Sequence, residues 1–142
     1  MKKYLFISLT ILVINILSFN AMGQNEIKAG DSDTLCILWT SGDPDVANKM
    51  VFMYSQGAIR NGWWKHVEFI VWGPSQQLIS ENEEIQKEIK KMMLAGIKFD
   101  ACKACADMYC VSDKLIDVGI DVRYMGIALT EILKSNKKLM TF

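Results

Sequence analysis

Short apolar runs alternate with longer amphipathic stretches along most of the chain, and this alternation is the main guide to the fold. The runs are nearly continuous in apolar residues, which is typical of strands that are buried on both faces of a parallel sheet. Successive parallel strands need a crossover connection, and the amphipathic stretches supply helices for it. The expected strands are residues 34–39, 67–72, 97–101, 121–125 and 138–142, the last of them at an edge.

The first amphipathic stretch has suitable residues at both helix boundaries. Asp43 can cap a helix N-terminus, Pro44 fits the first turn, and the Asn61-Gly62 step can end the helix. Helical spacing also predicts which residues face the core. These are Val46, Met50, Met53 or Tyr54, and Ile59.

The later helices are predicted in the same way. The longest runs from 75 to 95, and we expect a break near Ser80 because Ser80 and Glu83 have the spacing of a capping box. Gly96 would end this helix. The residues expected on its buried side are Ile85, Ile89, and Met92 or Met93. The remaining helical segments are expected at 102–110, 113–117 and 127–135.

Strands that alternate with helices predict a single α/β domain over residues 34–142. Its mostly parallel five-stranded sheet would carry helices on both faces, joined by right-handed crossovers. Gly42 and Gly73 mark turns, and neither belongs to a phosphate-binding or dinucleotide-binding pattern. The sequence therefore implies no nucleotide cofactor.

The segment before this domain predicts a secretory signal peptide over residues 1–23. A short positive start precedes an apolar run from 4 to 19, and residues 21–23 include the small side chains that a signal peptidase reads. The run is short for a membrane span, which needs about 20 apolar residues. The alternative is an uncleaved anchor. Residues 24–33 are polar and small, and we interpret them as a flexible lead-in.

This leader also bears on location and partners. The mature protein would be periplasmic or secreted, without membrane association after cleavage. Removing residues 1–23 takes away two lysines and no acidic residue, so the remaining chain is slightly acidic. Neither its charge nor any basic cluster indicates nucleic-acid binding.

The chain has four cysteines, and three of them crowd into nine residues. Such crowding favours a site over a set of long-range disulfides, although an exported protein is free to form disulfides. The crowded residues are Cys102, Cys105 and Cys110. Cys36 lies inside the first strand pattern, and we expect it in the core.

Cys102 and Cys105 are the candidate reactive residues. They follow the third strand, at the edge of a parallel sheet where ligands gather. A helix N-terminus lowers the pKa of a thiol, and the Cys-x-x-Cys spacing suits a disulfide or a mixed intermediate. The alternatives are an inert pair or a structural disulfide. Lys103 is an accessory candidate that could stabilise a thiolate, or else a simple exposed lysine.

Cys110 would lie about two turns beyond Cys102 if the helix continued that far. It can be a resolving thiol, a core residue or a metal ligand, and a core position is favoured. A zinc site would need a fourth ligand. The only histidine, His66, is distant in sequence and precedes a strand. We therefore expect neither a metal nor a cofactor.

The cysteine segment, Ala-Cys-Lys-Ala-Cys-Ala-Asp-Met-Tyr-Cys at 101–110, resembles the DsrE-like family (DsrE/DsrF/TusD, with the YchN-like fold). Residues 69–74, Phe-Ile-Val-Trp-Gly-Pro, and the opening strand with its Asp-Pro helix do so too. The resemblance covers nearly all of 34–142. It implies a compact α/β fold with a parallel five-stranded sheet, in homo-oligomers that are often trimers or hexamers.

The resemblance also suggests roles for the cysteines. Members of the sulfur-relay branch carry sulfur as a persulfide on a cysteine after the third strand, the position of Cys102. Cys105 matches a second cysteine that some branches have. Relay members usually have an arginine and a glycine where this chain has Tyr109 and Cys110. They also work in the cytoplasm, whereas this chain begins with an export signal.

Three functions are compatible with these features. In the first, a carrier or transferase-like protein accepts sulfur on Cys102, with Cys105 sharing or resolving it, and exchanges it with donor and acceptor proteins or small thiols. In the second, Cys102 and Cys105 form a thiol–disulfide redox pair. A thioredoxin-like site would need a cis-proline facing the pair, and the chain has only Pro44 and Pro74. The third is a non-catalytic oligomeric binding module.

Overall fold

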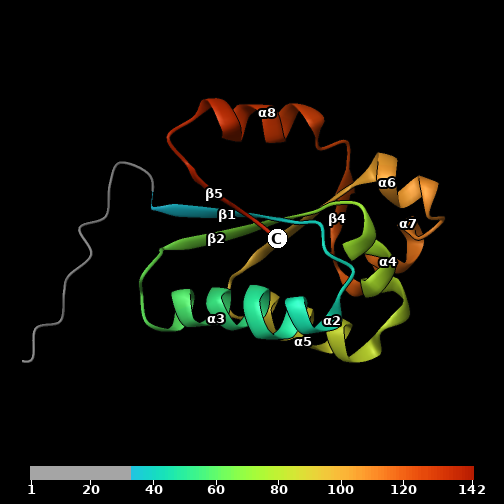
Figure 1. Ribbon diagram of the computed structural model, residues 1–142, viewed down its shortest axis with the longest axis horizontal. Coiled ribbons are helices and arrows are strands. Elements are labelled where there is room, and N and C mark those ends of the chain that lie inside the picture. Colours follow the sequence, from blue (N-terminus) through green and yellow to red (C-terminus); the bar gives the residue numbers. More distant parts are fainter. Residues whose placement is uncertain (1–32) are drawn as a thin grey trace, which may run out of the picture.

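A computed structural model describes residues 33–142, which form one α/β domain around a five-stranded sheet (Figure 1). All four strand pairings are parallel, in the order β4-β3-β2-β1-β5. The strands are β1 (Thr34–Trp39), β2 (His66–Val71), β3 (Lys98–Cys102), β4 (Asp121–Arg123) and β5 (Lys138–Thr141). The predicted fold class is confirmed, and β5 lies at an edge as expected.

The predicted signal peptide, residues 1–23, lies outside the described residues, and so does the lead-in up to residue 32. The last lead-in residue, Asp33, is held by the domain. Its carbonyl accepts a hydrogen bond from the His66 N–H at 3.1 Å, and its carboxylate lies 2.8 Å from Lys65 Nζ.

The direction of the crossovers decides which helices cover which face of the sheet. From β1 through β4 each strand lies beside the previous one on the same side, whereas β5 returns to the far side of β1. Right-handed crossovers therefore place the helices of the first three connections on one face and α8 on the other. Figure 1 shows α8 by itself above the sheet, with α3 and α5 below it.

The helices occupy most of the connections. They are α2 (Pro44–Val46), the π-helical segment Ala47–Phe52, α3 (Met53–Arg60), α4 (Pro74–Glu81), α5 (Glu83–Leu94), α6 (Lys103–Met108), α7 (Ser112–Val118) and α8 (Gly126–Lys134). Within residues 33–142, none of them combines the length and the apolar character needed to cross a membrane.

The main core fills the space between the sheet and α3, α5 and α7. Alternate strand residues point into it, because successive side chains of a strand face opposite sides. Phe69 at its centre stacks on Phe99 with ring centroids 4.4 Å apart, and Trp39 meets Phe52 edge-on at 5.2 Å. These aromatic contacts join the middle three strands to the first helical connection.

The intervening strand residues face α8 and form a different surface. Ile70 and Cys102 are buried there with Met125, in a small apolar cluster that α8 covers. The same face also carries charged residues: Glu68 lies nearer the start of the strands, and Asp100 is the register neighbour of Ile70. No residue of α8 is fully buried. One helix thus covers a face on which apolar and charged residues lie side by side.

The first helical stretch differs from its prediction. Asp43 caps it as expected, accepting hydrogen bonds from the Asp45 and Val46 N–H groups. Of the predicted core residues, Val46, Tyr54 and Ile59 pack against the core. Met50 and the alternative Met53 are exposed, at 52% and 65%, and Val51 and Phe52 are buried beside them. The cause is the π-helical segment, whose wider turn rotates the following residues relative to an α-helix.

The long helical stretch is broken at Asn82, two residues from Ser80, so the expected break is confirmed but Ser80 is not its cap. Asn82 Oδ1 caps α5 by accepting the N–H groups of Glu84 and Ile85, both at 3.1 Å. The Ser80 hydroxyl donates instead to the carbonyl of Gln77. The predicted capping box is therefore wrong. The expected buried side is confirmed, with Ile85, Ile89 and Met92 in the core.

Candidate functional site

Cys102 and Cys105 lie together where β3 ends. Cys102 is the last residue of β3 and the N-cap of α6, and Cys105 lies within the first turn of α6. Cys102 is buried at 3% exposure, whereas Cys105 is half-buried. Both are free thiols in one apolar cluster. The other members of this cluster are Ile70, Met125, Leu38, Trp72, Ala128, Leu129 and Ile132.

Gln76 fixes the backbone beneath the thiols. It lies in α4, is completely buried, and donates its side-chain amide to the carbonyls of Val71 and Cys102, at 2.9 and 3.0 Å. These carbonyls belong to the ends of β2 and β3, so Gln76 holds the two strand ends together. Sequence reasoning missed this residue, because the pattern did not indicate that a glutamine in this helix points inward.

The surroundings of Cys105 determine its protonation. Burial raises the pKa of the Cys105 thiol, a hydrogen bond from the Gly73 backbone N–H lowers it in part, and the neighbouring Cys102 raises it further. Desolvation thus outweighs the stabilisation that we expected from a helix N-terminus. Cys105 is protonated at neutral pH, and the prediction of a lowered thiol pKa is wrong for this residue.

The two accessory candidates are not part of the apolar cluster around the thiols. Lys103 Nζ is 2.8 Å from both carboxylate oxygens of Asp107, so its charge already has a partner. Cys110 is exposed and has a positive φ of 56°. The predicted helix to Cys110 ends at Met108, because the chain turns there toward α7. The core position favoured for Cys110 is therefore wrong.

The remaining sequence candidates are placed as follows. Cys36 is buried in the sheet as expected, and burial raises its pKa. His66 is exposed at the start of β2. Across residues 33–142, no three His, Cys, Asp or Glu side chains are grouped in a way that would hold a metal ion.

Exposure and pKa together predict the order in which the thiols react with iodoacetamide. Cys110 should be alkylated first at neutral pH because it is exposed. Cys105 should react more slowly, and its rate should keep rising beyond pH 9, because its pKa lies above the ordinary value of 9.0 and the thiolate is the nucleophile. Cys36 should react only after unfolding. Peptide mass spectrometry after timed alkylation measures each rate, and faster labelling of Cys105 than of Cys110 at pH 7 would contradict this order.

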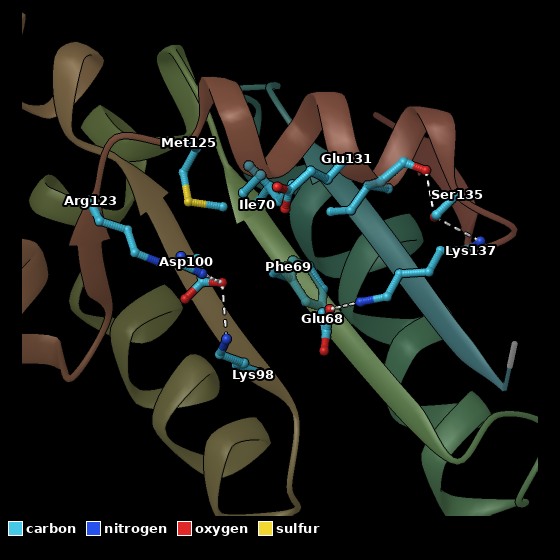
Figure 2. Close-up of a pocket in the computed structure, with 12 residues that line it drawn as sticks. Glu68, Phe69, Ile70, Lys98, Asp100, Arg123, Met125, Glu131, Ser135 and Lys137 are labelled. Carbon is cyan, nitrogen blue, oxygen red and sulfur yellow. Dashed lines mark hydrogen bonds and ion pairs between the residues drawn. The ribbon is translucent and has the colours of Figure 1, made fainter.

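A cavity of about 330 Å³ lies next to the thiol cluster, under α8 (Figure 2). Its apolar lining includes Ile70 and Met125, which also pack around Cys102. Its charged lining includes Asp100, the register neighbour of Ile70, and Arg123, joined by a 2.8 Å ion pair. Sequence reasoning missed this charged pair, because the pairing of β3 with β4 that brings the two residues together is not visible in the sequence.

Comparison with known proteins gives a relative but no activity. No family model matches the chain, and no curated protein matches it. Among solved structures, the conserved protein of unknown function BT1422 from Bacteroides thetaiotaomicron is 39% identical and superposes with a TM-score of 0.76. The match covers 80% of this chain and 100% of that one. It covers the whole of the relative, whose description names no substrate.

Proposed function

The chain belongs to the same family as BT1422 from Bacteroides thetaiotaomicron, and from its own thiol site we propose that it is a DsrE-like sulfur carrier that holds sulfane sulfur on Cys102. One observation carries this proposal. Two free thiols meet in an apolar cluster at the carboxyl edge of a parallel sheet, one buried and one half-exposed. Ligands of such sheets gather at this edge.

The cluster suits a persulfide because it limits access to the reactive sulfur. Ile70, Met125 and the underside of α8 enclose Cys102, so competing thiols reach a sulfur stored there slowly. Cys105 is the more exposed of the two thiols, and the Gly73 N–H lowers its pKa in part. It is the residue positioned to share the sulfur or to resolve the persulfide.

The proposed transfer conserves atoms and electrons. The Cys102 thiolate attacks the outer sulfur of a donor persulfide, R–S–S–H. The S–S bond of the donor breaks as a new S–S bond to Cys102 forms. The proton that Cys102 gives up ends on the leaving thiolate, so the products are Cys102–S–S–H and R–S–H. No external oxidant is needed, and delivery to an acceptor thiol repeats the same exchange.

The cellular location, the partners and the oligomeric state are proposed from the family resemblance and the predicted signal peptide. We propose that the protein works in the periplasm or outside the cell, exchanging sulfur with small thiols or partner proteins, as a homotrimer or homohexamer. Exposed apolar side chains on and near α8 support an oligomer, because Tyr124, Ile127 and Leu133 are 70%, 77% and 65% exposed. Large apolar side chains that gather on a surface often mark an interface.

The test is intact-mass spectrometry of the reduced protein after exposure to a polysulfide. Cys110→Ser should be the background for all variants, because the exposed Cys110 would form adducts of its own. In this background we expect one added sulfur atom. The adduct should disappear with Cys102→Ser and persist with Cys105→Ser. An adduct that survives Cys102→Ser would overturn the assignment of the carrier.

The proximity of Cys102 and Cys105 supports a second candidate, a thiol–disulfide redox protein. It predicts a different mass change under the same conditions. The protein would lose two hydrogen atoms instead of gaining sulfur, and either Cys102→Ser or Cys105→Ser would prevent the loss. This result would replace the carrier proposal.

A further inference from the structure

The cavity under α8 has the features of a binding site for a small polar molecule. It lies between α8 and the β2–β3 part of the sheet, and Figure 2 shows Asp100 and Glu68 on this face with Arg123, Lys98 and Lys137 around them. Its volume of about 330 Å³ is at the lower end of the range for ligand pockets. This size suits one amino acid or a short peptide.

Asp100 is the first indication of a ligand. Its side chain is buried in β3, and Oδ2 accepts from Arg123 Nη2 at 2.8 Å and faces Lys98 Nζ at 3.3 Å. Oδ1 is also buried and has no hydrogen-bond partner among residues 33–142. Buried carboxylate oxygens without a partner are rare in native proteins. A ligand group that donates a hydrogen bond, such as an ammonium group, would give Asp100 Oδ1 the partner that it lacks.

Arg123 is the second indication. Its Nη2 binds Asp100 and its Nε lies 3.1 Å from Asp121. A guanidinium carries five N–H donors, so further donors remain for a carboxylate at the mouth of the cavity. Across the cavity, Lys137 pairs with Glu68 at 3.0 Å. The walls therefore carry both signs of charge, which complements a zwitterion better than a simple anion or cation.

The cavity lies close to the thiol, because Arg123, which lines it, is the register neighbour of Cys102. Asp100 and Cys102 are two residues apart on β3, so they face the same side and lie roughly 7 Å apart along the strand. Met125 lines the cavity and also packs against Cys102. Its unbranched side chain adapts easily to a neighbour. A ligand with its charged groups at Asp100 and Arg123 would extend past Met125 toward Cys102.

We propose that this cavity binds a sulfur-bearing α-amino acid of the cysteine persulfide class, with its ammonium group on Asp100 Oδ1 and its carboxylate on Arg123. The inference rests on the proposed sulfur-carrier function and names the donor class for it. The outer sulfur of the bound persulfide passes to Cys102, and the donor leaves as the free amino-acid thiol. Atoms and electrons balance as in the exchange above.

Binding is tested separately from transfer, by calorimetric titration of the Cys102→Ser protein with L-cysteine under reducing conditions. We expect saturable binding. Cysteine methyl ester lacks the carboxylate and N-acetylcysteine lacks the ammonium group, so each should bind roughly tenfold more weakly or worse. Equal binding of the three compounds, or no binding of L-cysteine, would overturn the proposed ligand.

A variant pair locates the site. Arg123→Gln should weaken L-cysteine binding roughly tenfold. It should leave the already weak binding of the methyl ester unchanged, because the ester has no carboxylate for Arg123 to bind. Lys87→Gln is the control, since Lys87 forms an exposed pair with Glu84 on α5, on the other side of the sheet. Equal effects of Arg123→Gln on both ligands would refute the carboxylate contact.

The two proposals fail independently of each other. If L-cysteine does not bind but polysulfide still adds sulfur to Cys102, the ligand proposal is wrong and the carrier proposal stands. If L-cysteine binds with the expected charge dependence but Cys102 gains no sulfur, the cavity is a ligand site and the carrier proposal is wrong.

Discussion

Replacing Phe69 by alanine should lower the free energy of unfolding by about 3–5 kcal/mol. Phe69 is fully buried in the central part of the sheet, stacked on Phe99 and edge-on to Trp39 at 6.5 Å. Its removal would lose apolar burial and leave a cavity between the sheet and the helices that cover it. The surrounding strands are too rigid to close such a gap completely.

Urea denaturation, followed by tryptophan fluorescence, measures this loss because Trp39 lies in the same core. Leu94→Ala is the matched control: Leu94 is the last residue of α5 and is 90% exposed, so the substitution should change stability by no more than about 0.5 kcal/mol. A loss below about 1 kcal/mol for Phe69→Ala would show that this core collapses around the missing ring.

Gly73→Ala should destabilise the protein by about 1–3 kcal/mol. Gly73 has a φ of 65° and a ψ of −134°, a conformation that side chains with a Cβ strongly disfavour. No atom lies within 4 Å of the site where a Cβ would be added, so the cost comes from the backbone and not from a clash.

The same substitution should also affect the thiol site. The Gly73 N–H lowers the pKa of Cys105, and a shifted backbone would weaken that hydrogen bond. The pKa of Cys105 would then rise further, leaving less thiolate at a given pH and slowing its alkylation. Gly126→Ala is the control, because Gly126 begins α8 without a positive φ and with open space around it. If Gly73→Ala destabilises the protein but leaves the alkylation rate of Cys105 unchanged, the backbone at Gly73 does not control the Cys105 thiol.

The sequence predicted the positions of all five strands, because short stretches rich in apolar residues alternate with helical patterns along the chain. The helices were predicted less accurately. Helical periodicity assumes α-helical turns, so it could not show that residues 47–52 adopt a π-helix. The break near Ser80 was predicted, but its cap was assigned to Ser80 and not to Asn82, because both residue types cap helices and only the tertiary structure selects between them.

The thiol site was predictable in position but not in chemistry. The spacing of Cys102 and Cys105 after an apolar run placed them at the sheet edge, as found. Their burial, which controls the pKa of Cys105, depends on residues of α8 more than twenty positions later. The charged cavity was not predictable, although Asp100, an acidic residue inside an apolar strand, was a signal that the pattern alone left unexplained.

The pairing of β5 with β1 has a consequence for synthesis of the chain. β1 emerges from the ribosome long before its partner β5, and Thr40 donates to the carbonyl of a residue 102 positions later. The apolar edge of β1 therefore stays unpaired until β5 has been made. Unpaired strand edges promote aggregation, so the nascent protein should depend on chaperones more than its small size suggests.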